Sequence, residues 1–205
     1  MSGKIFYVMG KSASGKDTIY KELRARHPEL GRVCLYTTRP IRDGEKDGQE
    51  YFFVNESFLR KTREEKKLIE SRTYETVFGP WTYFTADDGQ IDLKSGKNYL
   101  MIGTLESYER MLAYYGEAVL VPIYIQVEDG LRLERALARE KTQHTPKYRE
   151  MCRRFLADEE DFCEENLARC KITHRYENVD LSACLDEIEA ANFPAAVPAF
   201  SPTRL

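Results

Sequence analysis

The sequence has few cysteines and few histidines, and neither type is spaced for a structural metal site. Its five cysteines form no C-x-x-C pair, and its three histidines are scattered. An odd number of unpaired cysteines indicates free thiols in a reducing compartment. No secretory-type apolar segment opens the chain, and no apolar run approaches the ~18 residues that a membrane span needs. We therefore expect a cytoplasmic protein with no membrane partner.

The chain also lacks an excess of positive charge. Its formal net charge is −3, whereas nucleic-acid-binding proteins usually carry a basic surface, so we expect no nucleic-acid partner. Hydrophobic residues make up 42% of the 205 residues and charged residues 32%, which suits one folded α/β domain. Local clusters of Arg and Lys can still bind small anions.

Apolar runs alternate with helix-like segments along the chain. The runs "KIFYVMG", "NYLMIG" and "AVLVPIYIQV" are typical of buried strands, and each precedes a segment that favours a helix. We also expect a strand at "RVCLY", a turn at Gly79 and Pro80, and one long helix over "KYREMCRRFLADEEDFCEENLARC". The alternation predicts an α/β fold, in which a parallel sheet carries helices on both faces.

Two segments interrupt this alternation. Residues 37–88 form a mostly β insertion and residues 140–153 a short polar lid, and segments of this kind commonly close over a ligand. We expect a single domain over 1–191, with its core in 1–36 and 89–191. Residues 192–205 are rich in Pro and Ala and are expected to form a flexible tail.

The segment after the first predicted strand has the spacing of a phosphate-binding loop. Gly10, four residues, Gly15 and Lys16 match the pattern G-x-x-x-x-G-K between a strand and a helix. Backbone N–H groups from Ser12 to Thr18 and the helix N-terminus can bind phosphates, and Lys16 can bridge the β- and γ-phosphates. The predicted ATP-binding residues are Gly10, Lys11, Ser12, Ala13, Ser14, Gly15, Lys16, Asp17 and Thr18.

Asp17 stands where this pattern usually has a serine or threonine that binds magnesium. A carboxylate oxygen is also a suitable ligand for Mg²⁺. We therefore predict Mg²⁺ as the cofactor of ATP and Asp17 as the metal residue. The alternative is that Asp17 only caps the helix, which aspartate also does well.

A second candidate anion site follows in the predicted insertion. Arg39 and Arg42 lie three residues apart on an expected loop, and Tyr51 follows. Arginine forks match pairs of phosphate oxygens, and a tyrosine hydroxyl adds a donor. The alternative is an ordinary solvated basic loop.

Several segments together resemble guanylate kinases. "TTRPIRDGE" and "GQEYFFV" are similar to that family's monophosphate-binding pattern, T-T-R-x-x-R-x-G-E followed by D-Y-x-F-V. "GKSASGKDT", "KLIESRTYETVFGPWTYFT", "RALAR" and "RRFLADEEDF" match further family segments in the same order. The resemblance covers nearly the whole chain. It implies a P-loop fold and transfer of the γ-phosphoryl group of ATP to GMP, and possibly to dGMP.

The resemblance also implies residue roles. The monophosphate of GMP would be held by Arg39, Arg42, Tyr51 and Tyr83. Glu70 would accept hydrogen bonds from the N1–H and the exocyclic amine of guanine, and Thr104 could add one hydroxyl contact. The catalytic residues around the transferring phosphoryl group would be Lys16, Arg135, Arg139 and Arg154, with Arg153 as a less favoured candidate than Arg154.

The chain departs from the family at the base-reading positions. Leu35 replaces a serine that helps to read guanine, and Ile102 and Thr104 replace two aspartates. Two alternatives to guanylate kinase activity therefore stay open. One is a kinase of the same fold with another acceptor, either a different nucleoside monophosphate or ribose 1,5-bisphosphate. The other is a binding module of this fold without catalysis.

Overall fold

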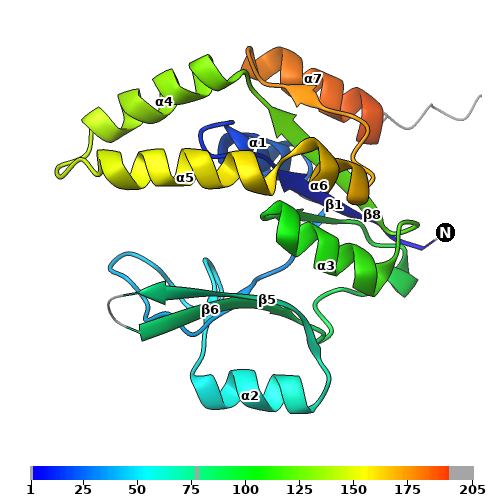
Figure 1. Ribbon diagram of the computed structural model, residues 1–205. Helices are drawn as coiled ribbons and strands as arrows, with labels where there is room; N and C mark the ends of the chain where they lie inside the picture. Colours follow the sequence, from blue (N-terminus) through cyan, green and yellow to red (C-terminus); the bar gives the residue numbers. More distant parts are fainter. Residues whose placement is uncertain (1, 77–78, 194–205) are drawn as a thin grey trace, which may run out of the picture.

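A computed structural model describes residues 2–76 and 79–193 (Figure 1). The predicted fold class is confirmed, because a parallel sheet carries helices on both faces and a smaller sheet lies beside it. Within the described ranges, no helix is long and apolar enough to cross a membrane. The predicted tail begins at 192, but Asn192 is the last residue of a helix and Phe193 is its C-cap; from 194 onward the tail lies outside the described residues.

The main sheet has five parallel strands in the order β2-β7-β1-β8-β9. These are β1 (Ile5–Met9), β2 (Gly31–Arg32), β7 (Tyr99–Ile102), β8 (Leu120–Gln126) and β9 (Tyr176–Glu177). β1 is buried along its whole length, and its alternate residues pack into different hydrophobic clusters on the two faces. The carboxyl ends of parallel strands meet at one edge, where ligands of such sheets bind.

Helices cover both faces of this sheet. α1 (Lys16–Arg26) and α7 (Leu181–Asn192) contribute to one hydrophobic cluster, and α3 (Leu105–Tyr115) and α6 (Glu164–Arg169) to the other. α4 (Asp129–Lys141) and α5 (Tyr148–Asp161) pack together and extend beyond the sheet, and a short 3-10 helix, η1 (Leu93–Ser95), precedes β7. The turn between α4 and α5 lies within the predicted lid.

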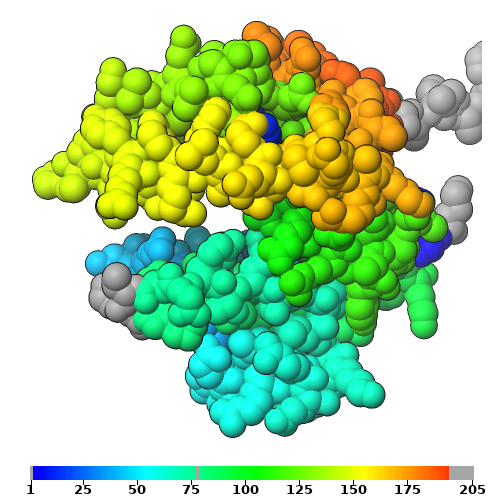
Figure 2. All heavy atoms as spheres, viewed as in Figure 1, coloured from blue at the N-terminus to red at the C-terminus, as the bar shows by residue number. Residues whose placement is uncertain are grey.

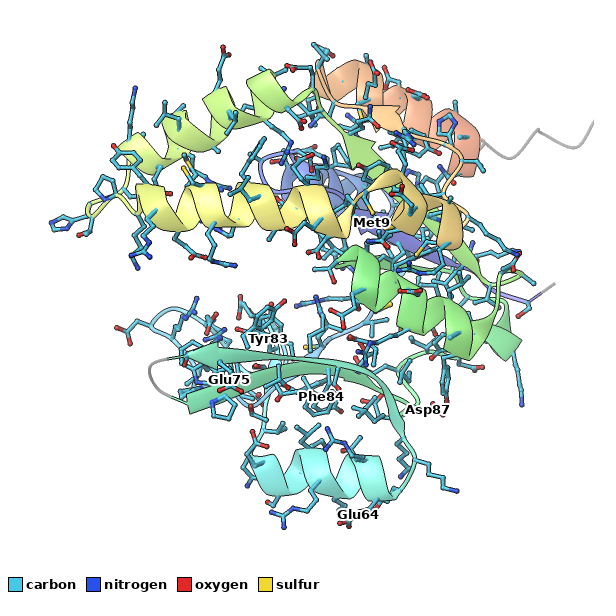
Figure 3. All side chains as sticks on the ribbon, viewed as in Figure 1. Met9, Glu64, Glu75, Tyr83, Phe84 and Asp87 are labelled. Carbon is cyan, nitrogen blue, oxygen red and sulfur yellow. The ribbon has the colours of Figure 1, made fainter. Side chains whose placement is uncertain are left out.

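The smaller sheet has the order β4-β3-β6-β5. It contains β3 (Tyr36–Thr37), β4 (Phe52–Phe53), β5 (Leu68–Thr76) and β6 (Gly79–Ala86), and α2 (Glu56–Glu64) covers one of its faces. Figure 3 shows Phe84 on the α2 face and Tyr83 on the opposite face, toward α5. The space-filling view shows a cleft between this sheet and the α4–α5 pair (Figure 2). The bounds of insertion and lid stay a prediction.

Two local predictions are wrong. "RVCLY" is not one strand, since Gly31–Arg32 pairs with β7 in the main sheet and Tyr36–Thr37 pairs in the smaller one. Gly79 and Pro80 do not form a turn, since both belong to β6 and pair with Thr76 and Glu75.

The expected long C-terminal helix is interrupted. It ends as α5 at Asp161 and resumes as α6 at Glu164. Phe162 lies at the interruption, is 5% exposed and stacks on Tyr124 of β8, with ring centroids 5.5 Å apart. Burial of this ring against the sheet therefore accompanies the break between the two helices.

Candidate functional site

The glycine-rich loop connects the carboxyl end of β1 to α1. Gly15 has a φ of 86°, a left-handed conformation that glycine adopts without strain. A Cβ atom on Gly10 would lie 2.5 Å from the carbonyl oxygen of Ile125. Gly15 is the N-cap of α1, and no side chain caps this helix. The first-turn N–H groups of α1 therefore have no side-chain cap and can bind an anion.

Two N–H groups of the loop have partners within the protein. The N–H of Ser12 donates to Asp158 Oδ2 at 2.7 Å, and the N–H of Ser14 donates to the carbonyl oxygen of Lys11 at 3.2 Å. Phosphate binding by the backbone is therefore best supported for the residues from Gly15 onward.

Lys16 and Asp17 begin α1 at the mouth of the loop. Lys16 Nζ lies 3.4 Å from Asp17 Oδ2, and the Asp17 side chain is 75% exposed. The capping alternative for Asp17 is wrong, because the N-cap is Gly15 and α1 has no side-chain cap.

The donor set at this position fits magnesium. Mg²⁺ is usually bound by one or two carboxylates together with substrate phosphates and water. Asp17 offers one exposed carboxylate beside the phosphate loop. Over residues 2–76 and 79–193, no group of three His, Cys, Asp or Glu side chains is placed to hold a metal alone. A magnesium ion here would therefore depend on the nucleotide for its other ligands.

A buried arginine that sequence reasoning missed joins the loop to α4 and α5. Arg132 of α4 is 1% exposed, and it donates to Asp129 Oδ1 at 2.9 Å and to Glu159. Its Nη1 also donates to the carbonyl oxygen of Ser12 at 3.3 Å. Lys11 pairs with the same Glu159 at 2.6 Å. This network fixes the first half of the loop.

Asn178 holds the second half of the loop. Its side chain is buried, and its Nδ2 donates to the carbonyl oxygen of Ser14 at 2.8 Å. A Cβ atom on Gly15 would lie 2.3 Å from this Nδ2, which is a second reason for glycine there. No sequence signal singled out Asn178, which directly follows β9 in the structure.

Arg39 is the centre of the second predicted anion site. It is 3% exposed, donates from Nη1 and Nη2 to the two carboxylate oxygens of Glu45 at 3.0 and 2.8 Å, and donates from Nε to the Tyr83 hydroxyl at 3.1 Å. Its Nη1 also donates to the carbonyl oxygen of Pro40. These bonds use four of the five N–H groups of a guanidinium, so Arg39 keeps one N–H for a ligand.

Glu45, which sequence reasoning missed, is the ion-pair partner of Arg39 in this site. Hydrogen bonds from Arg39 hold the pKa of the Glu45 carboxyl below its ordinary value, so the pair stays ionised at neutral pH. Its sequence signal was its position, because Glu45 is the glutamate that closes the Arg-x-x-Arg-x-Gly-Glu pattern.

Tyr51 and Tyr83 lie beside Arg39, with ring centroids 5.4 Å apart. Burial raises the pKa of Tyr51, so its hydroxyl stays protonated and can donate. Tyr83 accepts from Arg39, which leaves its own proton free for a ligand. The side chain of Arg42 is exposed, and its backbone N–H donates to Glu45 at 2.8 Å. The structure thus brings Arg39, Tyr51 and Tyr83 together, with Arg42 at the rim.

Glu70 lies deeper in the insertion and is 2% exposed. Its Oε1 accepts a hydrogen bond from Thr85 Oγ1 at 2.8 Å, and its Oε2 lies 3.5 Å from Arg72 Nε. Arg72 donates from Nη1 to Thr104 Oγ1 at 3.0 Å, and Thr104 in turn caps α3 by accepting the N–H of Ser107. The hydroxyl of Thr104, a predicted base contact, therefore already accepts a hydrogen bond from Arg72. Sequence reasoning missed Arg72.

The predicted lid arginines are less tightly placed. Arg135 Nη2 donates to the carbonyl oxygen of Val179 at 3.3 Å, and Arg139 is exposed near the end of α4. Arg153 forms a two-point contact with Glu150 at 2.8 and 2.7 Å. Arg154 has a weaker contact with Glu150, at 3.7 Å. The geometry thus leaves Arg154 freer than Arg153 to bind an anion.

A cavity of about 420 Å³ lies between the smaller sheet and α5. On the insertion side it is lined by Tyr51, Arg72 and Tyr83, and on the α5 side by Glu150 and Arg153. It opens in the cleft seen in Figure 2. An acceptor bound at Arg39 would therefore lie between the smaller sheet and α5.

Comparisons with known proteins point to one family. The sequence profile described as guanylate kinase matches residues 2–83. The chain is similar to the guanylate kinase of Nostoc sp., with 29% identity over 64% of this chain and 67% of the relative. It is similar to that of Trichormus variabilis, with 27% identity over 94% and 90%. Its fold resembles the crystal structure of guanylate kinase from Anaplasma phagocytophilum, with a TM-score of 0.58, 19% identity and 93% and 84% coverage.

Proposed function

We propose, from the similarity of this chain to guanylate kinases, that it belongs to this family, transfers the γ-phosphoryl group of ATP to GMP and yields ADP and GDP. The observation that carries the proposal is the pairing of two anion sites in one fold. One is the glycine-rich loop with the uncapped start of α1. The other is the buried Arg39 with Tyr51 and Tyr83, on the face of the smaller sheet that borders the cleft.

Each site has a distinct role in this reaction. The loop from Gly15 to Thr18 and Lys16 bind the phosphates of ATP, and Arg39, Arg42, Tyr51 and Tyr83 bind the phosphate of GMP. Phosphoryl transfer requires mainly positioning of the two substrates and neutralisation of charge. The acceptor oxygen is already ionised, so no general base is needed. Arg135, Arg139 and Arg154 supply positive charge around the transferring group from the α4–α5 pair.

Asp17, with Thr18, would hold the magnesium ion that accompanies ATP. When bound, Mg²⁺ neutralises phosphate charge at the reaction centre. Replacement of Asp17 by Ala is expected to weaken binding of ADP with magnesium about tenfold, because a metal ligand is lost. Asp17→Ser, which restores the usual hydroxyl, is expected to bind close to the wild-type level. Calorimetric titration with and without magnesium measures this. Equal affinity in all three proteins would contradict a metal role for Asp17.

A coupled ADP-release assay with magnesium-ATP tests the proposed function. The acceptor panel is GMP, dGMP, AMP, CMP, UMP and ribose 1,5-bisphosphate. We expect the highest kcat/KM with GMP and dGMP. Preferred turnover of another acceptor would reject guanylate kinase activity within the kinase class. No turnover of any acceptor by folded protein would favour a binding module.

A further inference from the structure

We propose that Arg72 is a specificity-determining residue that donates a hydrogen bond to the O6 carbonyl of guanine, beside Glu70. This inference rests on the proposed function. It addresses a gap in the predicted base site, because Leu35 and Ile102 carry no group that can hydrogen-bond to a base.

The side chain of Arg72 is held in a fixed place. Arg72 belongs to the middle of β5, and its side chain is 12% exposed. Its Nη1 donates to Thr104 Oγ1 at 3.0 Å. Because Thr104 is the N-cap of α3, this bond connects the insertion to the main domain. A guanidinium anchored in this way can present its remaining N–H groups in one orientation.

Arg72 Nε and Glu70 Oε2 form a long ion pair, and neither atom has a hydrogen bond. Among the described residues, Glu70 Oε2 and Arg72 Nε are buried without a hydrogen-bond partner, although they lie 3.5 Å apart. The other carboxylate oxygen of Glu70 is fixed by Thr85. Buried polar atoms normally have hydrogen-bond partners, so a donor and an acceptor left open together indicate a ligand with the opposite pattern.

Arg72 faces the cleft, and the fully buried Glu70 carboxylate lies directly beside it. Arg72 lines the cavity of about 420 Å³ together with Tyr51 and Tyr83. In the proposed function, those two tyrosines bind the phosphate of GMP. A nucleotide whose phosphate lies at Tyr51 and Tyr83 can therefore extend toward Arg72.

The pattern of donors and acceptors selects the base. Guanine has the O6 acceptor next to the N1–H donor, so Arg72 can donate to O6 while Glu70 accepts from N1–H. Adenine has an amino group in place of O6, and that group would face the N–H donors of Arg72. Hypoxanthine keeps both O6 and N1–H. A site that leaves buried polar groups unpaired against the wrong base discriminates strongly.

The test compares GMP, IMP and AMP with the wild-type protein, Arg72→Met and Arg72→Lys. We expect wild-type KM values for GMP and IMP to be far below that for AMP, with IMP above GMP because IMP lacks the exocyclic amine that Glu70 accepts from. In Arg72→Met, KM for GMP and IMP should rise roughly 10- to 100-fold, as expected for a lost hydrogen bond to a charged group. The KM values for AMP and ATP should stay within about twofold. Arg63→Met, at an exposed position of α2, is the matched control.

Arg72→Lys covers the case in which Arg72→Met does not fold, because it keeps a positive charge near Glu70 but loses the fork. It should also raise KM for GMP and IMP. An unchanged KM for GMP in a folded Arg72 variant would overturn the inference, and so would an equal loss for GMP and AMP. Equal wild-type KM values for GMP and AMP would overturn it without any variant. Absence of GMP turnover by the wild type would instead reject the proposed function itself, and this inference with it.

Discussion

Lys16→Ala is expected to lower kcat about 1,000-fold or more while GMP affinity stays within about twofold. The Lys16 ammonium lies at the start of α1, where the β- and γ-phosphates of ATP would bind. Its positive charge acts most strongly when negative charge develops on the transferring group. Steady-state kinetics with magnesium-ATP and GMP, together with calorimetric titration of GMP, measure both quantities.

Lys21→Ala provides the control, because Lys21 is an exposed lysine of the same helix. It is expected to leave kcat unchanged. Near-wild-type turnover of Lys16→Ala would reject the proposed position of ATP. A matching loss of GMP affinity would show that the substitution acts on the fold rather than on the transfer step.

Arg39→Ala is expected to raise the KM for GMP about 100- to 1,000-fold. The substitution removes the cation and also leaves the Glu45 carboxylate without its partner beside the incoming phosphate. Two negative groups would then face each other in a largely buried site. Initial rates over a range of GMP concentrations measure the change, and KM for ATP should stay nearly constant.

A double variant separates the two causes. Arg39→Ala with Glu45→Ala removes the repulsion as well as the cation, so it should recover part of the loss in KM. Lys46→Met, at an exposed position next to Glu45, is expected to behave like the wild type. If Arg39→Ala kept the wild-type KM for GMP, the acceptor phosphate would not bind at this site.

The local parts of the site could be predicted from the sequence. The glycine-rich loop is one continuous segment between a strand and a helix, so its spacing alone indicated its place. Arg39, Arg42 and Tyr51 also lie within one short stretch of chain. The geometry of such motifs depends mainly on the backbone of one short segment, so their sequence pattern is enough to identify them.

The supporting residues could not be predicted, because their roles depend on contacts between distant segments. Arg132 and Asn178 contact the loop from 120 and 164 residues away in the sequence. Arg132 resembled any charged residue on a helix, although it is 1% exposed. Arg72 likewise appeared as an ordinary polar residue of a β-prone segment. Only the packing of α3 against β5 brings it to Thr104.

The strand "RVCLY" shows a similar limit. Its apolar run predicted the correct local conformation in part, but the two ends of the run pair in different sheets. Hydrophobic periodicity reports burial and does not identify the partner strand.

Transfer of a labelled γ-phosphoryl group tests the central claim most directly. The protein is incubated with magnesium and γ-labelled ATP in the presence of GMP, and the products are separated by chromatography. Transfer between the two anion sites predicts that the label appears in GDP, in an amount equal to the ADP formed. Label that appears only in inorganic phosphate, or that stays in ATP while GMP is unchanged, would contradict the account.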